Sequence, residues 1–196
     1  MNPDPVISVV VPCFNEAQVI SACYERLTQV LAGTGESYEI VFVDDGSTDE
    51  TALLLCGIRD RDPHVVVLRL SRNFGQSAAT SAGLDAALGQ AVVTIDADLQ
   101  DPPELISEML GLWRQGYQLV YGIRETRFGE TWFKVMSSRL FNGLLSRLAN
   151  VYIAPNSGEF RLMDRCVVQA IRRMPERHRM LRGMAAWVGF RQAGLH

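Results

Sequence analysis

Five short runs of apolar, mostly β-branched residues recur along the first 123 residues, and segments with helical spacing separate them. The runs are VISVVVP, YEIVFV, HVVVLRL, AVVTIDAD and YQLVYG. Because each run is apolar over most of its length, it predicts a strand that is buried on both faces. Strands that alternate with helices predict an α/β fold, with a mostly parallel sheet and helices on both faces.

The segments between the runs predict four helices, over about residues 17–31, 51–60, 75–88 and 103–115. Gly33 is expected to end the first of these helices. Two S/D-x-x-E patterns resemble capping boxes, in which Ser47 pairs with Glu50 and Asp101 with Glu104. We therefore expect these four polar residues to have structural roles.

The composition is that of one soluble domain that spans residues 1–196. Hydrophobic residues make up 47% and charged residues 21% of the chain, which suits an ordinary globular core. The four cysteines are scattered without a CxxC pair, so we expect reduced thiols, a cytosolic compartment and no structural zinc. The sequence shows neither a signal peptide nor an apolar run long enough to span a bilayer.

Charge divides the chain near residue 114, and we expect two halves with different roles over about residues 1–123 and 124–196. From Arg114 to His196 there are 14 Arg or Lys and 5 Asp or Glu, whereas the first 113 residues hold 5 basic and 17 acidic residues. The acidic half is suited to cations and the arginine-rich half to anions, although a basic run can also be a solvated face. Residues 132–149 predict an amphipathic helix, whose apolar stripe belongs either to the core or to an anionic membrane surface.

Acidic side chains directly follow two of the predicted strands: Asp44 and Asp45 follow the second, and Asp96 and Asp98 end the fourth. Open α/β sheets bind ligands beyond the carboxyl ends of their strands. Residues two apart in an extended segment point the same way, so Asp96 and Asp98 are expected to converge, with Gln100 beyond them. These oxygen ligands suit Mg²⁺ or Mn²⁺ together with substrate phosphates. The other predicted strand ends carry Asn15, Glu16, Arg72, Asn73 and Arg124.

No glycine-rich phosphate loop of the GxGxxG or GxxxxGK[ST] type follows any of these strands. A metal ion and arginines would therefore have to hold any phosphates. This combination points to a nucleotide diphosphate whose leaving-group charge is neutralised by a cation.

Six motifs, in order along nearly the whole chain, resemble those of a known family. They are VVVPCFNE, VFVDDGSTDET, LSRNFGQSAATSAGLDAALG, TIDADLQDPPE, LVYGIRETRFGE and SGEFRLMDRCVV. Together they resemble the family 2 glycosyltransferases of GT-A fold that load a sugar onto a polyprenyl phosphate. Dolichol-phosphate mannose synthases and bactoprenol glucosyltransferases are of this type.

The resemblance implies a role for each matching residue. Pro12, Phe14 and Glu16 would line the nucleotide site, and Asp44 would meet the base or ribose, with Asp45 beside it. Asp96, Ala97, Asp98 and Gln100 would form the site for Mg²⁺ or Mn²⁺ and the diphosphate, with Asp98 and Gln100 as direct ligands. Arg161 would belong to the donor site unless it forms a structural ion pair.

The resemblance also implies that Asp98, Arg124 and Glu159 carry the chemistry. Arg124 would lie near the phosphates. Glu159 stands in GEFRL, where the family usually has an aspartate that is proposed as the catalytic base, so a longer carboxylate is present here. Arg177, Arg179 and Arg182 are expected on a surface that faces lipid phosphates or headgroups.

The implied reaction is an inverting transfer of a sugar from a nucleotide sugar, with UDP-glucose favoured, to undecaprenyl or dolichyl phosphate. Two alternatives stay open: a family 2 transferase that acts on a soluble glycan or protein, and a nucleotide-sugar-binding module without catalysis. The expected partners include an anionic membrane surface, on the cytoplasmic side of the cell membrane, and no nucleic acid; self-association is also open. The family pattern further predicts that the chain stops before C-terminal transmembrane helices.

Overall fold

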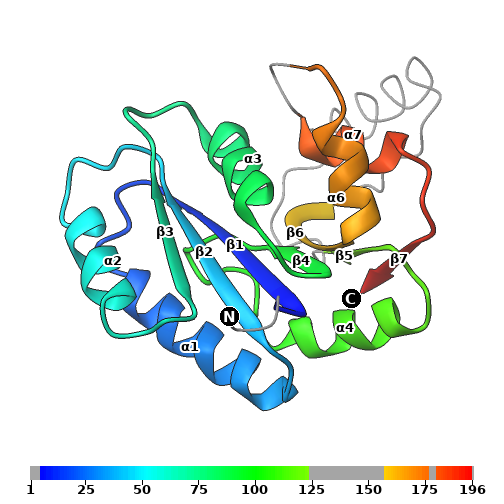
Figure 1. The fold of residues 1–196 in the computed structure, drawn as a ribbon, viewed down its shortest axis with the longest axis horizontal. Helices are drawn as coiled ribbons and strands as arrows, with labels where there is room; N and C mark the ends of the chain where they lie inside the picture. Colours follow the sequence, from blue (N-terminus) through cyan, green and yellow to red (C-terminus); the bar gives the residue numbers. More distant parts are fainter. Residues whose placement is uncertain (1–4, 124–156, 177–179, 196) are drawn as a thin grey trace, which may run out of the picture.

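The computed structural model describes residues 5–123, 157–176 and 180–195, and in these parts the chain forms one seven-stranded sheet (Figure 1). Its strands are β1 (Ile7–Cys13), β2 (Tyr38–Asp44), β3 (Val65–Arg69), β4 (Ala91–Thr94), β5 (Leu119–Ile123), β6 (Ser157–Asp164) and β7 (Gln192–Leu195). The order across the sheet is β3-β2-β1-β4-β6-β5-β7.

The first four strands of the chain pair in parallel, as their apolar character predicts. β1 lies between β2 and β4 and is parallel to both, and β3 is parallel to β2. β6 departs from this pattern, because it inserts between β4 and β5 and is antiparallel to both. β7 then pairs in parallel with β5. The expectation of a mostly parallel α/β sheet is confirmed, whereas β6 and β7 were not predicted.

Helices cover both faces of the sheet (Figure 1). They are α1 (Ile20–Thr34), α2 (Thr51–Arg59), α3 (Gln76–Ala86), α4 (Leu105–Arg114), α6 (Arg165–Arg172) and α7 (Leu181–Trp187). Side chains of β1 alternate between two cores: Val9 and Val11 pack with α1, α2 and α4, and Val10 packs with α3, α6 and α7. This alternation follows from the strand period of two residues, and it explains why both faces of β1 are apolar.

The predicted end of α1 is wrong by two residues. Gly33 lies inside the helix, and Gly35 is the C-cap, with φ 71 and its N–H donating to the carbonyl of Ala32. A left-handed residue after the last turn favours glycine because other residues carry a Cβ that clashes with the backbone. Both glycines fit the sequence pattern, and the geometry of the turn selects the second.

Neither predicted capping box forms. α2 begins after Glu50, whose side chain makes no capping bond, and Asp49 Oδ1 instead accepts from the backbone N–H of Thr51 at 3.0 Å. α4 begins after Glu104, and both carboxylate oxygens of Glu104 accept from Arg26 of α1, at 2.8 and 2.7 Å. At α4 a tertiary partner, Arg26, takes the carboxylate that the local pattern assigned to the helix end, whereas at α2 Asp49 makes the local bond in place of Ser47.

A buried polar network joins the strands at the amino ends of β1, β2 and β4. Glu39 Oε1 accepts from Ser8 Oγ at 2.6 Å and from the backbone N–H of Leu88 at 2.7 Å, and Ser8 Oγ accepts from the N–H of Gly89 at 2.7 Å. Arg165 donates to the carbonyls of Ala87 and Gly89. The network fixes the turn between α3 and β4, far along β1 from its carboxyl end.

Several predictions fall outside the described residues: Arg124, the amphipathic helix over residues 132–149, Arg177 and Arg179. In the parts of the chain that the structure describes, no helix has both the length and the apolar character needed to cross a membrane.

Candidate functional site

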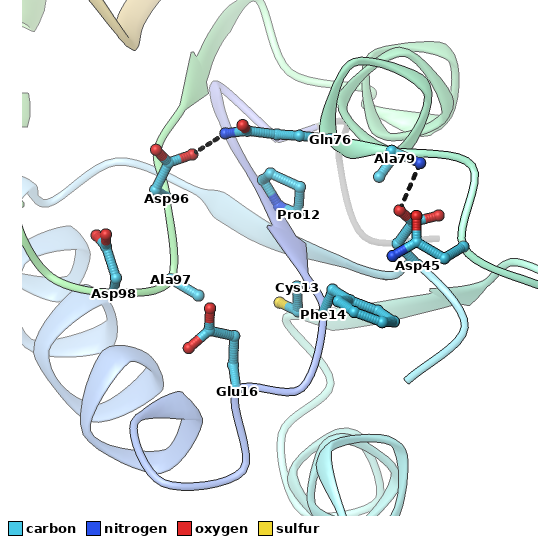
Figure 2. A pocket seen from close by; sticks show the side chains of 12 residues that line it. Pro12, Cys13, Phe14, Glu16, Asp45, Gln76, Ala79, Asp96, Ala97 and Asp98 are labelled. Carbon is cyan, nitrogen blue, oxygen red and sulfur yellow. Dashed lines mark hydrogen bonds between the residues drawn. The ribbon is translucent and has the colours of Figure 1, made fainter. Parts of the chain in front are cut away.

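A pocket of about 330 Å³ lies beyond the carboxyl ends of β1 and β4, beside the start of α3 (Figure 2). This is the position at which open α/β sheets bind ligands. Its walls come from the loops that follow β1, β2 and β3 and from the segment after β4. The lining residues are Pro12, Cys13, Phe14, Glu16, Asp45, Asn73, Gly75, Gln76, Ala79, Asp96, Ala97 and Asp98. The structure therefore brings together most of the residues that the sequence placed at a donor site.

The loop after β1 is held in place by the segment after β2. The backbone N–H of Asn15 donates to Ser47 Oγ at 2.9 Å, and that of Glu16 donates to Thr51 Oγ1 at 2.8 Å. Asn15 has φ 58, a left-handed conformation that asparagine tolerates better than most residues. Its Oδ1 accepts from the backbone N–H of Thr48 at 2.9 Å. These bonds fix Glu16 in the pocket wall, and they explain why Ser47 does not cap α2.

Asp44 lies outside the pocket, so the structure does not support its expected contact with a base or ribose. Its side chain is fully buried, Oδ1 accepts from the backbone N–H of Ser47 at 2.9 Å, and Arg69 Nε lies 3.2 Å from Oδ2 in an ion pair. Asp44 is still part of β2, and strand alternation places it on the same face as Phe42, beneath α1 and α2. Asp44 therefore stabilises the loop after β2 through its bond to the backbone of Ser47.

Asp45, one residue further on, reaches the pocket wall. Its Oδ1 accepts from the backbone N–H of Phe74 and its Oδ2 from that of Gly75, both at 2.8 Å. Charge-assisted bonds of this kind offset the cost of burying a carboxylate that is only 2% exposed. Asp45 therefore holds the loop that leads into α3, a role that the sequence did not indicate.

The segment after β4 is a turn and not the extended strand that was predicted. β4 ends at Thr94, and Leu99 has φ 59, so the chain does not continue the two-residue alternation to Gln100. Asp96 and Asp98 nevertheless line the pocket together. Gln100 is exposed and is not among the lining residues, and its backbone N–H donates to Asp98 Oδ1 at 3.0 Å. The role of Gln100 as a direct metal ligand stays a prediction.

The electrostatics of the pocket are those of a cation site. Four of its lining residues are acidic and none is basic. Burial raises the pKa of Asp96, and the charge of Asp98 raises it further. Burial and the charge of Asp98 likewise raise the pKa of Glu16. The carboxylates thus repel one another, and a bound cation would relieve this repulsion.

The residues fit a divalent ion that a ligand helps to coordinate. Within the described residues, no three His, Cys, Asp or Glu side chains lie close enough together to hold a metal ion by themselves. Mg²⁺ and Mn²⁺ are commonly held by one or two carboxylates plus substrate phosphates and water. The exposed carboxylate of Asp98, with Asp96 beside it, is suited to that arrangement.

The sequence predicted only Asn73 from one wall of the pocket. Asn73, Gly75, Gln76 and Ala79 line it from the loop before α3 and from the first turn of that helix. Gln76 Nε2 donates to Asp96 Oδ1 at 2.6 Å, across the pocket (Figure 2). The available signal was the polar stretch RNFGQ directly after the third strand, which was noted only for its first two residues.

Glu159 and Arg161 reach the same end of the sheet through β6. Thr94 Oγ1 donates to the carbonyl of Glu159 at 2.6 Å, which ties β6 to the end of β4. Arg161 is 3% exposed and donates to the carbonyl of Gly158 at 2.7 Å, and its Nη2 lies 3.7 Å from Glu159 Oε2. Burial lowers the pKa of the Arg161 guanidinium. Neither residue lines the pocket, and their expected roles in the donor site and in the chemistry stay predictions.

Comparison with known proteins shows the family to which the chain belongs. The family model described as glycosyl transferase family 2 matches residues 8–172. An uncharacterised glycosyltransferase of Synechocystis sp. is 47% identical over 95% of this chain and 58% of its own length. A prophage bactoprenol glucosyl transferase homolog of Escherichia coli is 40% identical over 93% of this chain and 60% of its own length. The chain thus spans somewhat more than half the length of these relatives.

Solved structures show the same fold. A mannosyltransferase from Pyrobaculum calidifontis, in complex with GDP-Man and Mn²⁺, superposes with a TM-score of 0.70 at 20% identity, over 99% of this chain and 55% of its own. Glucosyl-3-phosphoglycerate synthase from Mycobacterium tuberculosis, with Mn²⁺ and UDP, gives a TM-score of 0.63 at 22% identity, over 85% of this chain and 59% of its own. These likenesses confirm the GT-A fold, and with the family match over residues 8–172 they show that the chain belongs to glycosyl transferase family 2.

Proposed function

We propose that this chain is the catalytic domain of a glycosyltransferase that moves a sugar, with glucose from UDP-glucose favoured, onto a polyprenyl phosphate. The observation that carries the proposal is the acidic pocket beyond β1 and β4, in a chain whose relatives at 39–40% identity include bactoprenol glucosyl transferases. The loops that form this pocket come from four of the six segments that carry the family motifs.

The donor is proposed to lie along the pocket with its diphosphate near Asp98. Pro12, Phe14 and Glu16 form the wall toward the nucleotide, and Asp96 and Asp98 face the diphosphate. A divalent cation bound there supplies positive charge that offsets the charge developing on the departing nucleoside diphosphate. Mg²⁺ and Mn²⁺ both suit this donor set.

The acceptor reaction proposed is an inverting displacement. A phosphate oxygen of the lipid forms a bond with the anomeric carbon while the bond from that carbon to the nucleoside diphosphate breaks and its electron pair leaves with the diphosphate. A phosphate monoester has a second pKa of about 6, so its oxygen is largely anionic near neutral pH and needs little help from a base. Glu159, held at the end of β4 by Thr94, is then suited to orienting the acceptor or the sugar.

The proposal is tested by product analysis. The protein is incubated with radiolabelled UDP-glucose, undecaprenyl phosphate and Mn²⁺, and the label is partitioned between water and organic solvent. Label in the organic phase, lost in Asp98→Ala and kept in the exposed control Glu25→Ala, is the expected result. Label that appears in a water-soluble glycan or protein would favour the soluble acceptor, and donor binding without any transfer would favour a non-catalytic module.

The proposed site of action is the surface of the cell membrane, because a polyprenyl acceptor resides in the bilayer, and the four scattered cysteines favour its cytoplasmic side. The basic half of the chain supports contact with an anionic surface, since each basic residue near such a surface contributes about 1 kcal/mol. Co-sedimentation with vesicles of anionic and neutral lipid tests this contact. Binding that is equal on both kinds of vesicle, or unaffected by salt, would contradict it.

A further inference from the structure

Gln76 joins two walls of the pocket through one hydrogen bond. It is the first residue of α3, and its Nε2 donates to Asp96 Oδ1, after the end of β4, at 2.6 Å (Figure 2). The bond is made by a neutral amide to a carboxylate that faces Asp98 in a pocket lined by acids. The hydrogen bond thus points Oδ1 of Asp96 toward α3.

The backbone around Gln76 is held in place on both sides of this residue. Asp45 accepts the backbone N–H groups of Phe74 and Gly75, directly before Gln76. Further along α3, Gly83 lies so close to β1 that a Cβ on it would be 2.3 Å from Val10 Cγ1. Gln76 therefore bonds to Asp96 from the anchored start of α3, and this bond fixes the position of the Asp96 carboxylate.

The chemical type of the residue suits a cation site. A Lys or Arg at this position would neutralise Asp96 and compete with a metal ion, and an Asp or Glu would add to the repulsion among the carboxylates. An amide holds one carboxylate oxygen and leaves the negative charge in place.

We propose that Gln76 is a positioning residue that orients Asp96 for the uptake of a divalent cation together with the donor diphosphate. The inference rests on the proposed function, since it assumes that the pocket binds a nucleotide with a metal ion. It adds to that function a residue from a different segment of the chain, acting through Asp96 and not on the nucleotide.

The test compares nucleotide binding with and without metal. Gln76→Met keeps the length of the side chain and removes the donor. Calorimetry of UDP binding in Mn²⁺ should show about a three- to tenfold loss of affinity, the effect of one partly exposed hydrogen bond. UDP binding in EDTA and the melting temperature should match those of the wild type. The control Ser77→Ala, in the same turn of α3, should leave UDP affinity in Mn²⁺, UDP affinity in EDTA and the melting temperature unchanged. An equal loss in Mn²⁺ and in EDTA would overturn the proposal, because Gln76 would then act on the nucleotide or on the pocket shape.

A double-mutant cycle shows whether Gln76 acts through Asp96. If it does, adding Gln76→Met to Asp96→Asn should cause no further loss of Mn²⁺-dependent UDP affinity. Additive losses would refute the proposal. The side-chain amide resonance of Gln76 gives a readout without nucleotide: it should shift in Asp96→Asn and broaden on Mn²⁺ addition, and an unchanged resonance would also refute the proposal. Failure of lipid transfer, in contrast, would leave these comparisons intact and would count only against the proposed acceptor.

Discussion

Gly83 is the residue whose substitution by alanine should show most clearly how closely α3 packs on the sheet. A Cβ at this position would lie 2.3 Å from Val10 Cγ1 and 3.0 Å from Val43 Cγ2, and both valines are fully buried. Carbon atoms in contact are normally about 3.5–4.0 Å apart, so α3 or the valines must move by roughly 1 Å. Overpacking of this kind costs about 1–3 kcal/mol.

Helix propensity acts in the opposite direction, since alanine is favoured over glycine by about 1 kcal/mol inside a helix. We therefore expect Gly83→Ala to lower the free energy of unfolding by up to about 2 kcal/mol. For a chain of this size the melting temperature should fall by up to roughly 8 °C. Because Gln76 and Ala79 line the pocket from the same helix, UDP affinity in Mn²⁺ should fall as well.

The control is Gly57→Ala in α2, where nothing lies within 4 Å of the added Cβ. There only the propensity term remains, so this variant should be more stable than the wild type by up to about 1 kcal/mol. The two variants are compared by calorimetric melting. If Gly83→Ala melts at or above the temperature of Gly57→Ala, the close approach of α3 to β1 and β2 is refuted.

Three further predictions concern stability. Gly35→Ala should destabilise the protein by about 1–2 kcal/mol because of the left-handed C-cap, whereas Gly33→Ala should be neutral or stabilising; urea unfolding distinguishes them, and equal effects would contradict the assignment of the cap. Glu39→Ala should lower the free energy of unfolding by about 2–4 kcal/mol, because it leaves the buried Ser8 hydroxyl and the Leu88 N–H without their acceptor. Its control is Glu36→Ala, which removes a surface ion pair with Arg114 and should cost under about 1 kcal/mol. Similar losses of stability in the two melts would argue against the network. Burial raises the pKa of Asp62, but hydrogen bonds from His64 and Tyr24 outweigh this effect and hold the pKa below its usual value. Asp62 therefore stabilises the fold above about pH 4, and this contribution is lost as the pH falls through the depressed pKa. The stability difference between wild type and Asp62→Asn should shrink with acidification, and a constant difference in urea melts from pH 6 to pH 3 would be the contrary result.

The strand-end rule predicted much of the site because it depends on local signals. Glu16, Asp45, Asp96 and Asp98 follow apolar runs that could only be buried strands, and parallel strands bring their carboxyl ends to one edge of a sheet. The rule does not resolve single residues near a strand end. Asp44 is the last residue of β2 and points away from the pocket, although it neighbours Asp45 in the sequence.

By itself, the amino-acid sequence determined the alternation of strands and helices and the gathering of acids at one edge, since β-branched runs and helical spacing act within a few residues. Only the tertiary structure decided that β6 inserts antiparallel between β4 and β5, which ties Glu159 to Thr94. It likewise decided that Gln76 meets Asp96 across twenty positions of sequence. Such contacts depend on which strands pair and on how closely α3 approaches β1. No local periodicity encodes either feature, because the free energy of these contacts arises only when distant segments pack together.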